Sequence, residues 1–193
     1  MHSRSDDPFD DALTAATDRI LAAVRGTAAS NPVVIIDGRS GAGKSSLAAR
    51  LIRAWPLRAP AQLLALDSVY PGWDGLARGA QYARERVLVP HARGRIGIWR
   101  RWDWELGEAA EAHAVDPALG LVMEGCGALG AASARLADVT VWVDGPADSR
   151  RARALARDGE AFRAHWDMWA EQEETHIADD RPQEIADIRV RTP

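Results

Sequence analysis

A glycine-rich segment at positions 38–45 has the residue types and spacing needed to bind a polyphosphate. It reads GRSGAGKS and matches the pattern G-x-x-x-x-G-K-[ST], directly after an apolar run. Glycines let successive backbone N–H groups face one anion, and the dipole of a following helix adds to the attraction. We therefore expect the phosphates of a nucleotide to be bound by Gly38, Ser40, Gly41, Ala42, Gly43, Lys44, Ser45 and Ser46.

Lys44 is the only lysine in a chain of 193 residues that otherwise carries 23 arginines. An ammonium is a compact charge on a flexible stem, whereas a guanidinium is a broad planar fork. The motif predicts that Lys44 reaches the β- and γ-phosphates as a catalytic residue and that the Ser45 hydroxyl binds Mg²⁺. The alternatives are a glycine-rich turn without a ligand and a lysine retained by chance in an arginine-biased chain.

Two acidic residues follow apolar runs that are typical of buried strands. Asp67 comes directly after QLLAL, and Glu124 comes directly after LGLVM. Ligands of open parallel sheets lie beyond the carboxyl ends of the strands, so both carboxylates are expected beside the phosphates. One could hold Mg²⁺, and the other could orient an acceptor hydroxyl and take its proton. Taken alone, Asp67 could equally cap a turn.

Apolar runs alternate with amphipathic segments along the chain, which indicates βαβ units and a mostly parallel sheet flanked by helices. The expected strands lie at 33–36, 62–66, 119–123 and 139–143, with a short edge strand at 96–102 and a last strand within 186–192. The expected helices lie at 10–25, at 45–55, at 76–88 with an end at Pro90, and over most of 147–176 with a break at 157–159. We therefore expect an α/β P-loop NTPase fold with one domain over 1–193.

Composition limits the classes of function. The formal net charge is −4, so no general attraction to nucleic acid or to an anionic membrane is expected. The single cysteine, Cys126, leaves no intramolecular disulfide and suits a reducing compartment. The segment MHSRSDDPFDD has no apolar signal core, and no later stretch is long enough to span a bilayer. These features predict a cytoplasmic protein.

Four segments come in the order seen in uridine and cytidine kinases and related P-loop small-molecule kinases. They are the P-loop, LDSVY at 66–70, VMEG at 122–125 and VDGPADSRRARALARD at 143–158. The chain resembles this family from 33 to about 157. The resemblance implies ATP and Mg²⁺ as cofactors, Asp67 as general base toward an acceptor hydroxyl with Tyr70 near the acceptor, and Glu124 as the acid near the metal.

The resemblance also implies a small helical lid near 147–165 that carries arginines over the phosphates. By register, Arg153 and Arg157 would reach the transferring phosphoryl group, and Arg150 would lie near the adenine. Mobile arginines that neutralise transition-state charge are what phosphoryl transfer requires. A solvated helix face is the alternative interpretation of this run.

The acceptor side departs from that family, which usually has a histidine- and phenylalanine-rich segment there. The corresponding segment reads IWRRWDWELGE at 98–108. Asp103 could bind acceptor hydroxyls and Trp102 or Trp104 could stack on a ring, or the tryptophans could only pack against the edge of the sheet. The substrate-binding residues that we expect are Tyr70, Trp73 and Asp103.

The sequence favours ATP- and Mg²⁺-dependent phosphoryl transfer to a hydroxyl of a small molecule, with a nucleoside as the leading acceptor. Some neighbouring residues would instead suit an acceptor that already carries phosphate, namely Arg78, Arg84, Arg86, Arg100 and Arg101. A nucleoside monophosphate kinase, another small-molecule kinase and a non-catalytic ATP-binding regulatory protein are the alternatives. The expected partners are the small-molecule acceptor and a possible second copy of the chain.

Three further residues are not assigned to the chemistry. Cys126 reads as a small packed residue in a tight turn, because no histidine lies near it in sequence. His165 and His176 are eleven residues apart on a charged helical segment, which is not a metal-ligand spacing.

Overall fold

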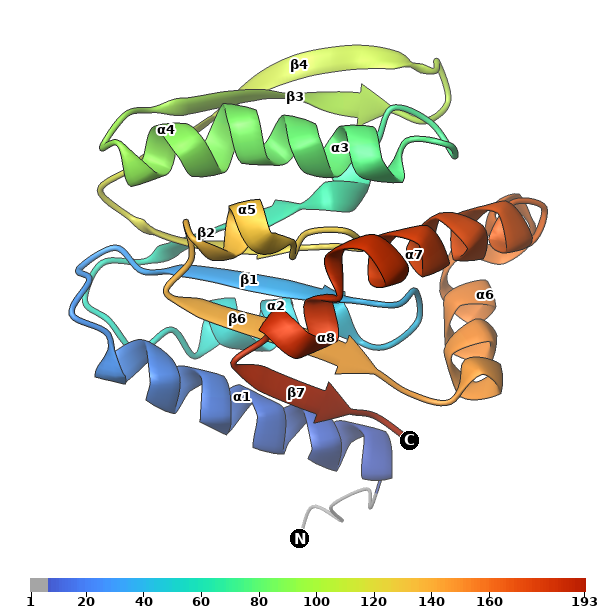
Figure 1. Ribbon diagram of the computed structural model, residues 1–193, viewed down its shortest axis with the longest axis horizontal. Helices are drawn as coiled ribbons and strands as arrows, with labels where there is room; N and C mark the ends of the chain where they lie inside the picture. The colour runs from blue at the N-terminus through green and yellow to red at the C-terminus, as the bar shows by residue number, and fades with distance from the viewer. Residues whose placement is uncertain (1–6) are drawn as a thin grey trace, which may run out of the picture.

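The central sheet is built from five parallel strands. The computed structural model describes residues 7–193, and the strand order is β2-β5-β1-β6-β7 (Figure 1). The strands are β1 (Val33–Gly38), β2 (Ala61–Ala65), β5 (Gly120–Glu124), β6 (Val139–Asp144) and β7 (Ile188–Arg191). All pairings within this sheet are parallel, which confirms the α/β class.

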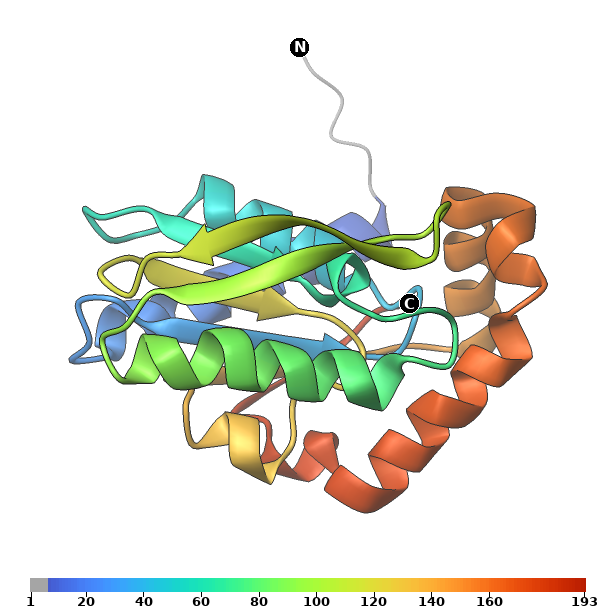
Figure 2. The ribbon, with the colours of Figure 1, turned by 90° about the horizontal axis from the view of Figure 1, so that it is seen from above.

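Helices cover both faces of this sheet (Figures 1 and 2). On one face lie α1 (Pro8–Gly26) and α2 (Lys44–Arg53). On the other face lie α3 (Leu76–Ala83), α5 (Ala131–Ala134), α7 (Trp166–Asp180) and α8 (Pro182–Ile185). The helix α6 (Ala147–Arg163) stands at the end of the sheet toward which the strands point.

The central strand β1 divides the core between these two layers. Val34 and Ile36 pack in the cluster that α1 and α2 cover, whereas Val33 and Ile35 pack in the cluster on the α3 and α7 side. Successive side chains of a strand point to opposite faces, so a strand covered on both faces must be apolar at every position. This requirement explains the unbroken run VVII.

The segment expected at the edge of the sheet forms a separate hairpin instead. β3 (Gly97–Asp103) pairs antiparallel with β4 (Glu108–Val115), and neither strand joins the five-stranded sheet. The strand expected at 96–102 is therefore confirmed as β3, but its expected place at the edge of the main sheet is wrong, and β4 was not predicted. β4 reads EAAEAHAV, and alanine and glutamate favour helices, so its strand conformation depends on pairing with β3.

The helix that precedes this hairpin continues past Pro90. A π-helical turn (Arg84–Leu88) joins α3 to α4 (Val89–Ala92), and Pro90 lies in the first turn of α4. The π-helical turn interrupts the regular α-helical hydrogen bonding just before Pro90, as shown by the bond from Val89 N–H to the Arg84 carbonyl oxygen, and such interruptions accompany prolines within helices. The expected end at Pro90 is therefore wrong, and the hairpin runs alongside α3 and α4 (Figure 2).

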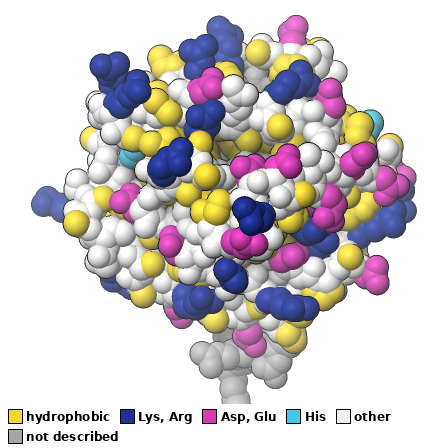
Figure 3. Space-filling model, viewed as in Figure 1, with side chains coloured by type: hydrophobic (Ala, Val, Ile, Leu, Met, Phe, Trp, Pro, Cys, Tyr) yellow, Lys and Arg dark blue, Asp and Glu magenta, His cyan; other side chains and the backbone are white. Residues whose placement is uncertain are grey.

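The arginine-bearing segment is helical with a break, as expected. Gly159 has a φ of +66° inside α6, and α7 begins after a short turn. Acidic and basic side chains are interspersed over the described part of the face shown in Figure 3, without a continuous field of either sign. Within residues 7–193, no helix combines the length and the apolar character needed to cross a membrane. The first six residues of the predicted polar N-terminal segment lie outside the described residues.

Candidate active site

The topology brings three functional segments to one edge of the sheet. The P-loop follows β1, Glu124 ends β5, and Asp67 lies in the short turn after β2. β5 pairs with both neighbours, so that Glu124 is opposite Ile36 of β1 and Ala65 of β2. The strands that follow β1 in the chain lie on both sides of it, so the order of strands reverses there. In parallel sheets, ligands usually bind in the crevice at the carboxyl ends of the strands at such a point.

The P-loop closes tightly around its glycines. Gly41 has a φ of +73°, and a Cβ there would lie 1.9 Å from the carbonyl oxygen of Arg150. Gly43 has a φ of +104° and precedes α2, which begins at Lys44. A side chain at Gly41 would push α6 away from the loop, so glycine is required for this close approach.

Below this loop lies a cavity of about 220 Å³. It is lined by Phe9, Ser40, Gly41, Gly43, Lys44, Ser45, Ser46, Asp67, Glu124, Cys126, Arg153, Ala154 and Arg157. We call it the phosphate cavity. It brings together the predicted lysine, both strand-end acids and two of the lid arginines. Gly38, Ala42 and Arg150 from the predicted nucleotide site do not line it.

Lys44 is only 8% exposed. Its Nζ donates to the carbonyl oxygen of Arg39 at 3.0 Å and contacts Cys126 Sγ at 3.3 Å. Burial would lower the pKa of Lys44, but the negative charges of nearby carboxylates, namely Glu124, Glu173 and Asp67, raise it. Lys44 therefore remains charged inside the site.

The oxygen atoms near Lys44 suit a magnesium ion. The cavity brings together the Ser45 hydroxyl and the carboxylates of Glu124 and Asp67, and hard oxygen ligands are those that Mg²⁺ prefers. Within residues 7–193, no cluster of three or more His, Cys, Asp or Glu side chains is arranged for metal binding. A few protein oxygens completed by phosphates and water are typical of Mg²⁺ in nucleotide sites, so the residues present fit this ion.

Glu124 is buried, and burial raises the pKa of its carboxyl group, although the charges of Lys44 and Arg157 act in the opposite direction. Its carboxylate form therefore depends on the positive charges around it.

The three predicted lid arginines have different positions. Arg150 is buried and donates to the carbonyl oxygens of Gly145 and Ser40, so it ties α6 to the loop. Arg153 lines the phosphate cavity, and its Nε donates to the carbonyl oxygen of Gly41 at 2.8 Å. Arg157 is half-exposed, pairs with Asp158 and lies 3.9 Å from the Asp67 carboxylate. Arg157 is thus the lid arginine placed beside Asp67.

A second cavity of about 420 Å³ adjoins the first, and we call it the aromatic cavity. Its lining residues are Ser40, Asp67, Tyr70, Trp73, Trp104, Glu105, Arg157, Asp158, Ala161, Phe162 and Trp169. Ser40, Asp67 and Arg157 line both cavities. The hydroxyl of Tyr70 donates to the carbonyl oxygen of Cys126, so it is the aromatic ring of Tyr70 that lines this cavity.

Trp73 and Trp104 form much of this aromatic wall. Their ring centroids are 4.8 Å apart, and Trp73 also stacks on Phe162 and His165. The indole N–H of Trp104 donates to the Asp67 carbonyl oxygen at 2.9 Å, which fixes the tip of the hairpin over the turn after β2. The tryptophans of 99–104 therefore do not share one role, since Trp99 stacks on His113 of the hairpin.

Asp103 lies outside both cavities, contrary to the expected contact with an acceptor. Its Oδ1 accepts from the backbone N–H groups of Glu105 and Leu106, and Arg101 contacts Oδ2. The bond from Leu106, with smaller contributions from Arg101 and Glu105, lowers the pKa of Asp103. The carboxylate caps the hairpin turn and has no oxygen directed at the site.

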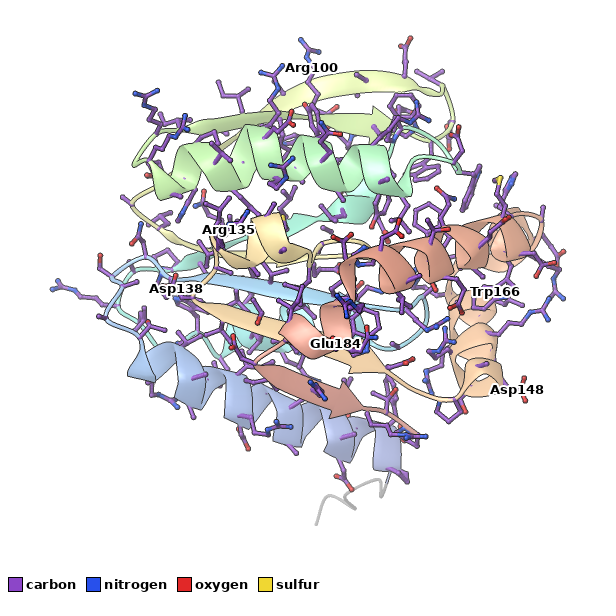
Figure 4. All side chains as sticks on the ribbon, in the orientation of Figure 1. Arg100, Arg135, Asp138, Asp148, Trp166 and Glu184 are labelled. Atoms are coloured by element: carbon purple, nitrogen blue, oxygen red, sulfur yellow. The ribbon has the colours of Figure 1, made fainter. Side chains whose placement is uncertain are left out.

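The basic residues near the acceptor segments also lie outside the aromatic cavity. Arg78 pairs with Asp74, and Arg101 pairs with Glu111 and Asp103. Arg100 donates to the Ala110 carbonyl oxygen and lies on the outer side of the hairpin (Figure 4). Arg84 and Arg86 are likewise absent from the cavity lining.

Sequence reasoning missed a buried ion pair beneath the P-loop. Asp37 accepts from the backbone N–H groups of Gly38, Gly127 and Leu129, and its Oδ2 lies 2.8 Å from His176 Nε2. The only signal was an aspartate inside an otherwise apolar strand. A charged residue there needs buried partners, so Asp37 organises the loop and the turn after β5 together.

Several solved structures share this fold, and two of them are described as kinases. One is a possible uridine kinase from Bacillus stearothermophilus, which is 15% identical, with 94% of this chain and 98% of that chain covered at a TM-score of 0.68. Another, from Silicibacter sp. TM1040, is described as a candidate fructose transport system kinase and is 20% identical, with 92% and 98% covered at 0.57. The YGR205w protein is 11% identical, with 97% and 94% covered at 0.53.

No protein-family model matches the sequence, and no curated protein matches it significantly. The structural comparisons show that the chain has the fold of P-loop kinases. Within that class it resembles the structure of the possible uridine kinase, at low sequence identity.

The environment of Lys44 generates a first prediction. Lys44→Ala should raise the Kd for Mg·ADP at least about tenfold, because a charged hydrogen-bonding group is lost. Lys44→Arg should raise this Kd by a similar factor, because the planar guanidinium does not fit between the Arg39 carbonyl oxygen and Cys126. Calorimetry measures both, with thermal unfolding as the control for folding. Wild-type affinity in Lys44→Arg would refute the steric argument.

The pair between His176 and Asp37 generates a second prediction. Burial would lower the pKa of His176, but hydrogen bonds and the charges of Asp37 and Asp180 raise it. A raised pKa stabilises the fold below the unfolded value of about 6.5, and this stability is lost as pH rises through the folded pKa. His176→Gln should therefore lower Tm more at pH 5.5–6 than at pH 9, on the order of several degrees at the lower pH.

Thermal scans of wild type and variant across this pH range measure the difference. His113→Gln on the exposed hairpin controls for the loss of a histidine elsewhere. An equal or larger loss of Tm at pH 9 would contradict the prediction.

Proposed function

We propose that the chain is a kinase that transfers the γ-phosphoryl group of ATP to a hydroxyl of a small molecule. One observation carries this proposal: the phosphate cavity and the aromatic cavity share Asp67 and Arg157. A compound held among the aromatic rings would present a hydroxyl to Asp67 beside phosphates held by the P-loop. A carboxylate and an arginine at such a junction are the groups that phosphoryl transfer to a hydroxyl uses.

Each residue of the proposed site would have a separate task. The P-loop N–H groups and Lys44 would bind and orient the phosphates, and Ser45 with Glu124 would hold Mg²⁺. The bound ion would neutralise charge on the phosphate oxygens. Asp67 would accept the proton of the acceptor hydroxyl, and Arg157 would stabilise negative charge that develops during transfer.

The aromatic cavity favours an acceptor with a ring and without a phosphate group. Its walls include aromatic rings that suit stacking on a flat ring or packing on a sugar. Among the residues that the structure describes, Arg157 is the only basic one in its lining, against the three acids Asp67, Glu105 and Asp158. A phosphorylated acceptor would meet net negative charge here. We therefore propose a nucleoside as the leading acceptor.

The proposed roles of Asp67 and Glu124 predict different defects. Asp67→Asn should keep Mg·ATP binding and lose turnover by roughly two to four orders of magnitude, because the general base is missing. Glu124→Gln should instead raise the Mg²⁺ concentration needed for half-maximal activity. Steady-state kinetics with Mg²⁺ titrations measure both effects, and the same shift in metal dependence in both variants would refute this division.

The raised pKa of Glu124 adds a check on its role. Its carboxylate is protonated at a higher pH than that of an exposed glutamate, so the wild type should need more Mg²⁺ as pH falls. Glu124→Gln should lose this dependence.

The aromatic cavity predicts how the acceptor is selected. Trp104→Ala should raise the acceptor KM about tenfold, as expected for one lost stacking surface, and should leave the Kd for Mg·ADP unchanged. The assay is ADP release stimulated by uridine or cytidine, compared with the matching monophosphates. Trp99→Ala is a matched control, since Trp99 lies on the same hairpin and stacks outside the cavity.

Stimulation by monophosphates alone would place the protein among nucleotide kinases. Stimulation only by a non-nucleoside alcohol would refute the nucleoside and leave the kinase proposal intact. ATP binding without turnover on any acceptor would favour a regulatory protein instead.

A further inference from the structure

The helix α7 holds the beginning of the P-loop through consecutive polar contacts. His176 pairs with Asp37, and Glu174 pairs with Arg39. Glu173 of the same helix accepts from the backbone N–H of Ser40, with an N···O distance of 2.8 Å. One helix therefore contacts residues 37, 39 and 40, where the chain leaves β1 and enters the loop.

Glu173 differs from Glu174 because it is buried, with 4% exposure. Its Oε1 accepts both from Ser40 N–H and from the Cys126 thiol, whose sulfur lies 3.2 Å away. In this contact the thiol is the donor and the carboxylate oxygen is the acceptor. A buried carboxylate needs such donors, and it receives both from the walls of the phosphate cavity.

The same sulfur also contacts Lys44. The contacts form a chain from Lys44 Nζ through Cys126 Sγ to Glu173 Oε1, which also holds Ser40 N–H. Glu173 is not part of the cavity lining, so it reaches these groups from behind the loop. Its negative charge is also among those that raise the pKa of Lys44.

We propose that Glu173 is a positioning residue of the nucleotide site, an inference that rests on the proposed function. It acts through Ser40 and Cys126, and it fixes the loop backbone and the Lys44 ammonium before the nucleotide arrives. A site held in its binding geometry binds more tightly, because less ordering is required on binding. A carboxylate that competed with a phosphate for the P-loop N–H would predict a change in Kd of opposite sign.

The experiment measures the Kd for Mg·ADP by calorimetry on the full chain, with thermal unfolding of each variant. Glu173→Ala removes the acceptor oxygen and should raise Kd about tenfold or more, because the Ser40 N–H is then left without its acceptor. Glu173→Gln keeps an acceptor oxygen at the same reach and should stay within about threefold of wild type. Glu171→Ala is the matched control, because Glu171 is exposed on the same helix.

Four outcomes would overturn the proposal. Tighter binding by Glu173→Ala would show that the carboxylate competes with the nucleotide. Unchanged Kd with lowered Tm would show that Glu173 only stabilises the fold. Absence of Mg·ADP binding by the wild type would overturn the nucleotide site itself, whereas wild-type binding with unaffected variants would overturn only the role of Glu173.

A second variant keeps the test decisive if Glu173→Ala does not fold. Glu173→Asp retains the charge but withdraws the carboxylate by one methylene from Ser40 N–H. It should raise Kd more than Glu173→Gln does, because reach matters more than charge for a positioning contact. The reverse order would overturn the proposal.

Discussion

The nearly buried charge of Lys44 determines what must surround the P-loop. An ammonium removed from water is stable only if hydrogen-bond acceptors and opposite charges replace its hydration. The Arg39 carbonyl oxygen and Cys126 Sγ provide direct contacts, and Glu124 with Asp67 provides negative charge. The acids proposed for the metal and the acceptor therefore also keep the lysine charged. Both the proposed chemistry and the stabilisation of Lys44 require Glu124 and Asp67 to lie close to the Lys44 ammonium.

The parallel pairing of the strands brings Glu124 and Asp67 to the same end of the sheet as the P-loop. Glu124 and Asp67 are separated by more than fifty residues in the chain, yet each lies where an apolar strand ends. If β2 ran antiparallel to β5, the residue that follows β2 would emerge at the opposite edge of the sheet, far from the P-loop. The parallel pairing of β2 with β5 is therefore a requirement for a shared site.

Local patterns could be predicted from the sequence, and long-range contacts could not. The P-loop is eight consecutive residues, and the buried strands are apolar runs, so both are visible without a partner. β4 is alanine- and glutamate-rich, and its strand state comes from pairing with β3. Glu173 and His176 contact residues 133 and 139 positions away. No spacing rule connects such positions, and a polar helix face looks the same whether it meets solvent or the P-loop.

The side chains at the junction of the two cavities are exposed to solvent, so a kinase with this site would need a way to exclude water. The side chains of Asp67 and Arg157 are 59% and 52% exposed, although they lie only 3.9 Å apart. A phosphoryl group beside them would be open to water, and a kinase must prevent that hydrolysis. The aromatic walls of the adjoining cavity are fixed by packing, as the stacking of Trp73 with Phe162 and the bond from Trp104 to Asp67 show. In the proposed reaction, an acceptor seated against these rings would itself cover Asp67. Enclosure of the site would therefore depend on the acceptor as much as on α6.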